Sequence, residues 1–217
     1  MRIQSLNVAV PKRIEHKGEE VWTGIYKLPS SARRWVRRLN IDGDGQADPT
    51  VHGGIDKAVY AFPSEHYDYY RTELGQDPYL PGQFGENLTT DGMLESRVRI
   101  GDRYRVGDAL FEVSQPRSPC YKFAIRMGSA GALGIMIDSG RTGFYLRVLE
   151  AGEIGAGDAI EAVDSDPSAP TVEEINRLYY LDRKNVSGLE RALGCERLAR
   201  VFRDEFAKRL EKMGVTS

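Results

Sequence analysis

One cysteine stands in a segment whose neighbouring residues could place it at the start of a helix. Residues 113–122 read Val-Ser-Gln-Pro-Arg-Ser-Pro-Cys-Tyr-Lys, so a strand is expected to end at Gln115 and two prolines stiffen the exit. Ser118 is a good N-cap, and Pro119 suits the first helical position. This spacing predicts that Cys120 lies in the first helical turn, where free N–H groups and the helix dipole favour an anion.

The charges beside Cys120 point to a functional thiolate. Arg117 and Lys122 flank it in sequence, and nearby cations, like a helix N-terminus, lower the pKa of a thiol. The thiolate is the form that binds a metal or attacks an electrophile. A free cysteine is otherwise usually a small buried hydrophobe, and that is our interpretation of Cys195, which follows Gly194 in an ordinary amphipathic helix.

Two further segments carry residues suited to binding a ligand. In residues 51–60, Gly53 and Gly54 let the backbone approach a ligand closely, and His52, Asp56 and Lys57 bracket them. Residues 84–90 form a polar loop between apolar anchors, and it contains Gly85, Glu86 and Asn87. Taken singly, a Gly-Gly pair is more often just a turn, and a lone histidine is more often structural.

Two other patterns do not carry a site. Residues 42–48 resemble the start of a calcium loop, but Ala47 stands where glycine is needed and Gly53 where the bidentate glutamate is needed. The basic cluster at residues 33–38 suits a solvated strand or helix face, since the whole chain has a net charge of only −2. Docking of an acidic redox partner is a second use for that cluster.

Composition indicates an ordinary soluble globular protein. The 217 residues are 41% hydrophobic and 29% charged, which excludes a disordered chain, and the net charge of −2 gives no overall field for nucleic acid or membranes. No apolar run approaches the roughly 20 residues of a membrane span. Two cysteines give no disulfide framework, and the start of the chain has no apolar signal-peptide block, so a cytoplasmic location is expected.

The patterning predicts a mainly β fold with interspersed helices. Alternation and turn signals favour strands at residues 3–10, 57–62, 98–106, 109–115 and 144–149. Short strands with frequent glycine turns favour a closed or nearly closed barrel. A helix is expected from Ser64 or Glu65 to Leu74, and another from near Ser129.

The end of the chain has a different composition. Residues 165–170 form a linker, and the pairs Thr171/Glu174 and Ser187/Glu190 each read as a helix capping box. Residues 1–164 are therefore predicted as a barrel domain and 165–217 as a linker with a three-helix subdomain. The apolar helical faces there suit a homodimer and an intramolecular dock equally well.

Taken together, these segments resemble the MOSC family, named after the C-terminal part of molybdenum cofactor sulfurases, and most closely its YiiM-like branch. The resemblance is carried, in the family's order, by Gly45–Asp48, His52–Gly54 with Asp56–Ala58, Phe62–Pro63 with Glu65–Tyr67, Phe84–Gly92, Ile100–Asp102 and Ser114–Lys122. The helical tail resembles the three-helix appendage of that branch.

The resemblance implies a β-barrel with a cleft for the molybdenum–pterin cofactor and a cysteine that ligates molybdenum. The matching cysteine here is Cys120, and a soft thiolate is a sensible ligand beside the pterin's dithiolene sulfurs. The pyridoxal-phosphate domain of the full sulfurases is absent from this sequence, so that cofactor is not expected. Relatives reduce N-hydroxylated compounds, and the YiiM-like branch is associated with detoxifying N-hydroxylated purine bases.

From these implications we predict that the chain is a molybdenum-dependent reductase, which removes the N-bound oxygen from such substrates. Arg117, Lys57 and Lys122 are candidates to neutralise the pterin phosphate. Gly53, Gly54, Gly85, Glu86 and Asn87 are candidates to contact the pterin, and His52 or Asp56 to relay protons. No flavin, haem or iron–sulfur motif is present in the sequence, so a separate reductase is expected to donate the electrons.

Two alternatives remain open. The chain could be a non-catalytic carrier of the molybdenum cofactor, or a sulfur relay that uses a Cys120 persulfide. It could also be an assembly protein in which the barrel serves as a scaffold for the helical tail.

Overall fold

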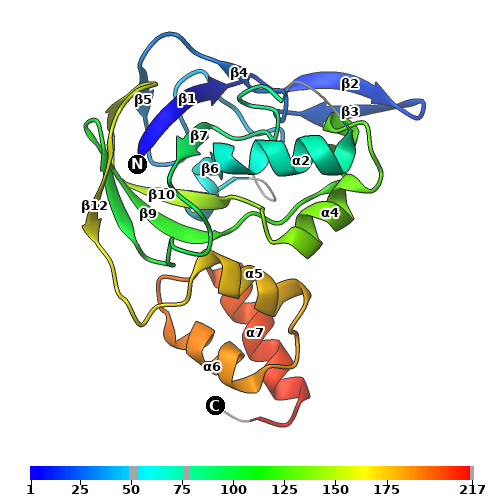
Figure 1. Ribbon diagram of the computed structural model, residues 1–217, viewed down its shortest axis with the longest axis vertical. Coiled ribbons are helices and arrows are strands. Elements are labelled where there is room, and N and C mark those ends of the chain that lie inside the picture. The colour runs from blue at the N-terminus through cyan, green and yellow to red at the C-terminus, as the bar shows by residue number, and fades with distance from the viewer. Residues whose placement is uncertain (49–52, 76–78, 216–217) are drawn as a thin grey trace.

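The larger part of the molecule is a mixed β-sheet, seen in the upper half of Figure 1. The computed structural model describes residues 1–48, 53–75 and 79–215. Its main sheet has eight strands in the order β12-β8-β9-β10-β6-β7-β1-β4. In chain order these are β1 (Arg2–Val8), β4 (Leu28–Pro29), β6 (Val59–Pro63), β7 (Leu88–Asp91), β8 (Arg103–Val106), β9 (Ala109–Pro116), β10 (Phe144–Glu150) and β12 (Ile160–Asp164). Only β6 and β7 run parallel among these neighbours.

The two ends of the sheet meet and close it into a barrel. Arg2 of β1 forms an antiparallel bridge with Ala159, directly before β12. The amide of Ile3 donates to the carbonyl of Asp158 at 2.9 Å, and the amide of Ile160 donates to that of Met1 at 3.0 Å. The expected mainly β barrel with interspersed helices is therefore confirmed.

Two small sheets lie beside the barrel, and neither was expected from the sequence. Strands β2 (Lys12–His16) and β3 (Glu19–Thr23) form a hairpin that projects from the barrel in Figure 1. Strand β5 (Arg34–Val36), inside the basic cluster, pairs with β11 (Gly152–Ile154). Arg33 and Arg37 of this cluster pair with Asp158 and Asp42, at 2.7 and 2.6 Å. The charges of these two arginines are therefore paired within the chain, and docking of an acidic partner by the cluster stays a prediction.

Several predicted elements begin later than expected. The strand predicted for residues 98–106 begins only at Arg103, since Gly101, with φ of 89°, turns the chain just before it. The strand predicted from residue 57 begins at Val59, because Lys57 ends a short 3-10 helix, η1 (Ile55–Lys57). The helix predicted from residue 64 or 65 is first a 3-10 turn, η2 (Ser64–His66), and then α2 (Tyr67–Leu74).

A cluster of aromatic rings fixes these helices on the strand that carries Val59–Pro63. The helix expected near Ser129 is α4 (Ala132–Ser139), and the helix expected from Pro119 is α3 (Tyr121–Arg126). The rings of Phe62 and Phe84 stack with centroids 4.1 Å apart, and Phe123 of α3 stacks on Phe84 at 5.9 Å. All three rings are fully buried, so β6 and α3 are held against each other.

The tail folds into the three expected helices, α5 (Val172–Tyr180), α6 (Val186–Gly194) and α7 (Arg200–Lys212). The capping box of Thr171 and Glu174 is confirmed, with both reciprocal hydrogen bonds present. The second capping box is wrong, because Asn185 caps α6 by accepting from the amide of Gly188 at 2.9 Å. In the described part of the chain, no helix is long and apolar enough to cross a membrane.

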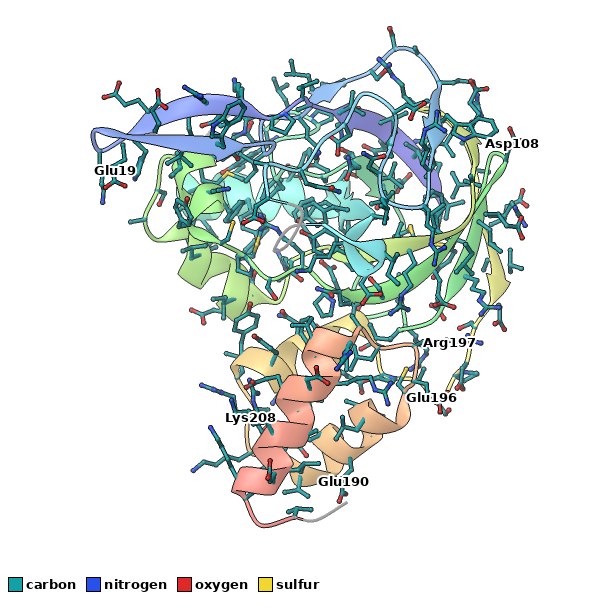
Figure 2. The ribbon with its side chains drawn as sticks, turned by 180° about the vertical axis from the view of Figure 1, so that it is seen from behind. Glu19, Asp108, Glu190, Glu196, Arg197 and Lys208 are labelled. Atoms are coloured by element: carbon teal, nitrogen blue, oxygen red, sulfur yellow. The ribbon has the colours of Figure 1, made fainter. Side chains whose placement is uncertain are left out.

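The tail docks on the barrel of its own chain. The amide of Ala199 donates to the carbonyl of Ser114 in β9 at 3.0 Å, and Arg147 of β10 donates to the carbonyl of Arg197 at 2.7 Å. Figure 2 shows Arg197 at this junction. A single apolar core continues from barrel residues such as Phe111 into tail residues such as Phe206. The apolar helical faces therefore serve an intramolecular dock, and the predicted boundary at residue 164 does not divide the core.

A shared core predicts that barrel and tail unfold together. Phe206 is fully buried, and its replacement by alanine should lower the free energy of unfolding by about 3–5 kcal/mol. Both tryptophans, Trp22 and Trp35, lie in β3 and β5, so their fluorescence reports the barrel region. In urea, fluorescence and helical circular dichroism should shift together in one transition. A helical transition that precedes the fluorescence change would show that the tail is independent.

Candidate functional site

A cleft of about 630 Å³, including its open mouth, lies where loops from both halves of the barrel meet. Its walls come from the segment after β3, from residues 44–47 and from the loop before β7. Further lining comes from the exit of β9 and the start of α3. Of the candidate residues named from the sequence, the structure brings together in this cleft Lys57, Gly85, Asn87, Arg117, Cys120 and Lys122.

Cys120 lies at the entrance to α3 and not inside its first turn. Its backbone is extended, with φ of −128° and ψ of 168°, and α3 begins only at Tyr121. The predicted helix start at Pro119 is therefore wrong, because residues 117–120 form an irregular segment between β9 and α3. This segment carries the partly buried thiol of Cys120 to the cleft.

Arg117 is a buried cation that faces the cleft. The residue is 5% exposed, and its guanidinium lies over the rings of Phe123 and Tyr60, at 4.8 and 5.3 Å from their centroids. Its Nη1 also lies 2.9 Å from the sulfur of Met136. Within the described residues, no carboxylate pairs with Arg117. A buried charge without a counter-charge is costly, so an anionic ligand would stabilise this arrangement.

Two lysines add positive charge to the same cleft. Lys57 ends η1, and Lys122 lies in the first turn of α3. Burial lowers the pKa of Lys57, against the opposing influence of Asp56. Together with Arg117 these side chains give the cleft the charge and the donors that a phosphate group requires.

A second set of polar side chains lines the cleft, and in this set the positive charge is matched by a negative one. Lys27 and Asp44 form a buried ion pair, and Asp44 also accepts from the Asn87 amide at 2.9 Å and from the backbone N–H of Ala9 at 2.9 Å. Asn87 in turn accepts from the backbone N–H of Tyr60 at 3.0 Å. These hydrogen bonds therefore connect the loops that carry Lys27, Asp44 and Asn87 to β6. Burial lowers the pKa of Lys27, while Asp44 opposes that shift.

Two tyrosines from adjacent strands lie side by side in the cleft. Tyr60 of β6 and Tyr145 of β10 are register partners, and their ring centroids are 5.3 Å apart. The hydroxyl of Tyr60 donates to the carbonyl of Thr142 at 2.7 Å. Burial raises the pKa of both phenols, so both keep their protons at neutral pH.

Glu86 does not line the cleft, although the sequence named it as a pterin contact. Its carboxylate is fully buried and accepts from the amides of Gly82 and Phe84, at 2.8 and 2.9 Å. The hydroxyls of Thr89 and Tyr67 also donate to it, at 2.9 and 2.5 Å. Glu86 therefore shapes the loop that presents Gly85 and Asn87, and its role as a cofactor ligand is not supported.

The buried carboxyl of Glu86 gives a pH prediction. Burial raises its pKa above the ordinary value of 4.5, so its stabilisation is fully present below that value and is lost as pH rises through the folded-state pKa. The difference in unfolding free energy between wild type and Glu86→Gln should therefore fall above pH 4.5. The fall should be about 1.4 kcal/mol for each unit by which the pKa is raised. Urea titrations from pH 4 to 8 measure it, and a difference that grows with pH would contradict it.

The remaining sequence candidates do not gather with Cys120. Asp56 lies outside the cleft lining, and its carboxylate pairs with Arg147 at 2.6 Å. A proton-relay role for Asp56 is therefore not supported by its position. Gly53 and Gly54 precede η1 and are not part of the cleft lining. His52 lies outside the described residues, so its role stays a prediction.

Lys27, Asp44, Tyr60 and Tyr145 were missed from the sequence. Asp44 lies in the segment dismissed as an imperfect calcium loop, and Lys27 follows the hairpin that was not predicted. Alternation does not single out the tyrosines, since every residue of β6 is buried and Tyr60 belongs to the same apolar cluster as Phe62.

Comparisons with known proteins agree with this architecture. A family model described as "MOSC domain" matches residues 48–161, and one described as "YiiM-like, 3-alpha helix domain" matches residues 170–212. The crystal structure of YiiM from Geobacillus stearothermophilus superposes with a TM-score of 0.82 at 34% identity. That match covers 96% of this chain and 98% of the other.

Two sequence relatives are also informative. The uncharacterized protein YflK of Bacillus subtilis (strain 168) is 39% identical over 211 residues, which is 97% of this chain and 95% of that protein. A protein of Gibberella moniliformis (strain M3125 / FGSC 7600) named "Reductase" is 36% identical over 173 residues. The match covers 78% of this chain but only 30% of the fungal protein.

Proposed function

Because the chain belongs to the MOSC domain family and ends in a YiiM-like three-helix domain, we propose that its cleft binds the molybdenum–pterin cofactor and reduces N-hydroxylated compounds. One observation carries this proposal. A buried guanidinium without a carboxylate partner among the described residues lines the same cleft as a free thiol.

The residues of the cleft fit the chemical groups of this cofactor. Cys120 offers a soft sulfur ligand of the kind that suits molybdenum. Arg117, Lys57 and Lys122 offer positive charge and N–H donors to the pterin phosphate. Gly85 also lines the cleft, and its lack of a side chain leaves room for Ile25 of the same wall.

When bound, the cofactor would supply the two-electron chemistry that takes oxygen from the substrate nitrogen. The chain itself would orient the substrate and hold protons. Tyr60 and Tyr145 are protonated hydroxyl groups of the cleft, and Tyr145 is the better donor because the Tyr60 hydroxyl already donates to Thr142. Loss of the N-bound oxygen as water consumes two protons. A phenol in the same cleft as the thiol is placed to donate one of them.

Electrons would come from a separate reductase. The fungal relative named "Reductase" is much longer than this chain, so in that protein the corresponding module is joined to further sequence. We expect this chain to meet its electron donor as a separate protein. The cytoplasmic location expected from the sequence stays a prediction.

Turnover of an N-hydroxylated purine base tests the reductase function. The protein would be purified from a host that makes the cofactor, supplied with reduced methyl viologen, and assayed for the deoxygenated base by chromatography. The matched control is the same chain from a host that cannot make the cofactor. Only the loaded protein should form product. Loaded protein that forms none would contradict the reductase function and favour a cofactor carrier.

A further inference from the structure

The ammonium of Lys27 has unused hydrogen-bonding capacity inside the cleft. The residue is 7% exposed and lines the cleft, and its Nζ donates to the carboxylate of Asp44. A lysine ammonium carries three N–H groups. Among the residues that the structure describes, Asp44 is its only hydrogen-bond partner, so two donors have no acceptor from the chain.

Asp44 fixes the position of Lys27 and cancels its charge. The side chain of Asp44 is 2% exposed, and the Asn87 amide and the Ala9 backbone hold it in place, each at 2.9 Å. The ammonium therefore has little freedom to turn out to solvent. Because the pair is neutral, it has no requirement for an anion, in contrast to Arg117.

The cleft thus has two chemically different donor groups. One set consists of Arg117 with Lys57 and Lys122, and it suits a phosphate. The other set is Lys27 with its bound Asp44, and it suits an uncharged acceptor such as a carbonyl oxygen or a ring nitrogen. A ligand with an anionic group and a polar heterocycle would have a defined orientation between the two sets.

We propose that Lys27, held by Asp44, is a binding subsite for the acceptor atom of an uncharged nitrogen heterocycle. The proposal rests on the proposed function for the identity of that heterocycle. It is either the pterin ring of the cofactor or an N-hydroxylated purine base bound as substrate. Both ligands present ring nitrogens or carbonyl oxygens. The two are distinguished by whether the variants lose bound pterin or lose affinity for the base.

The test compares two variants of the subsite with a control. Lys27→Met removes the donors but leaves the buried Asp44 carboxylate unpaired, so it is expected to be less stable. Lys27→Met/Asp44→Asn removes both charges and keeps a polar side chain for Ala9 and Asn87. The control is Lys12→Met, since Lys12 is exposed on the hairpin and does not line the cleft.

Thermal unfolding identifies the variants that fold, and two quantities are then measured on them. These are pterin per chain after expression in a cofactor-competent host, and the Kd of the N-hydroxylated base by calorimetry.

A pterin subsite predicts that pterin content falls at least about tenfold in the folded double variant. A substrate subsite predicts normal pterin content and a Kd for the base that rises at least about tenfold. Lys12→Met should match wild type in both quantities. A folded double variant with wild-type pterin content and wild-type Kd would overturn the subsite. If only the reductase function is wrong, the double variant would still differ from wild type in pterin content or in Kd, while the wild type itself would show no turnover.

Discussion

Replacing Cys120 by alanine is expected to lower the molybdenum content of the purified protein by more than about tenfold, and to abolish reduction of N-hydroxylated substrates with it. The thiol lies in the cleft at the end of the irregular segment that follows β9, so its loss removes the soft donor without disturbing a packed core. Pterin should fall less than molybdenum, because Arg117 and the two lysines still bind the phosphate. Metal analysis by mass spectrometry and pterin analysis by fluorescence measure both in the same sample.

The chain offers a matched control for this substitution. Cys195 is also a free cysteine of intermediate exposure, but it lies at the end of α6, with its sulfur 3.9 Å from the carbonyl of Ile100. Cys195→Ala should retain wild-type molybdenum and activity. Equal molybdenum in wild type and Cys120→Ala would contradict the ligand assignment. A persulfide found on Cys120 in that case would favour the sulfur-relay alternative.

Replacing Arg117 by methionine should separate binding from stability. Its guanidinium pairs with no carboxylate among the described residues, so its removal leaves no buried anion unpaired. The ring contacts with Tyr60 and Phe123, worth about 0.5–2 kcal/mol, are lost together with the contact between Nη1 and the sulfur of Met136. The gain from removing a buried charge opposes that loss. In cofactor-free protein, the unfolding free energy should therefore stay within about 1 kcal/mol of wild type or rise. Pterin content after expression in a competent host should fall at least about tenfold.

Arg147 provides the contrasting case. It pairs with Asp56 at 2.6 Å and with the buried Glu112 at 3.0 Å, and it donates to the carbonyl of Arg197 at 2.7 Å. Arg147→Met therefore leaves Asp56 without its ion-pair partner and removes one of the two close cations of Glu112, the other being Arg103. This variant should lose about 3 kcal/mol or more of stability in cofactor-free protein. Urea unfolding of both variants measures the difference. A large loss of stability in Arg117→Met, with normal pterin content, would show that Arg117 is structural.

Much of the site was predictable because its chemistry is concentrated in short segments. Arg117, Cys120 and Lys122 lie within six residues, and the strand exit that carries them has a clear sequence signal. The loop containing Gly85 and Asn87 was found in the same way. The Lys27–Asp44 pair joins residues 17 apart in two irregular loops, and no periodicity links such positions. Glu86 and Asp56 were placed in the site by their neighbours in sequence, yet each satisfies its carboxylate elsewhere in the fold.

The fold was predictable at the level of class and element type, and less so in its closure. Period-two alternation identified β1, β9 and β10, and polar capping identified the start of α5. The contact between β1 and the start of β12 joins strands that lie near opposite ends of the strand order and far apart in the sequence. Local sequence patterns carry no information on such a contact. The docking of the tail was equally open, since an apolar helical face does not specify whether a barrel or a second chain covers it.

The most direct test of the cofactor cleft is the amount of pterin bound by the wild-type chain. The protein would be purified in parallel from a host that makes the molybdenum cofactor and from one in which its synthesis is blocked, and pterin and molybdenum would be quantified per chain. Our account predicts both in amounts approaching one per chain from the competent host, and neither from the blocked host. Protein that is folded yet free of pterin and molybdenum from the competent host would contradict it.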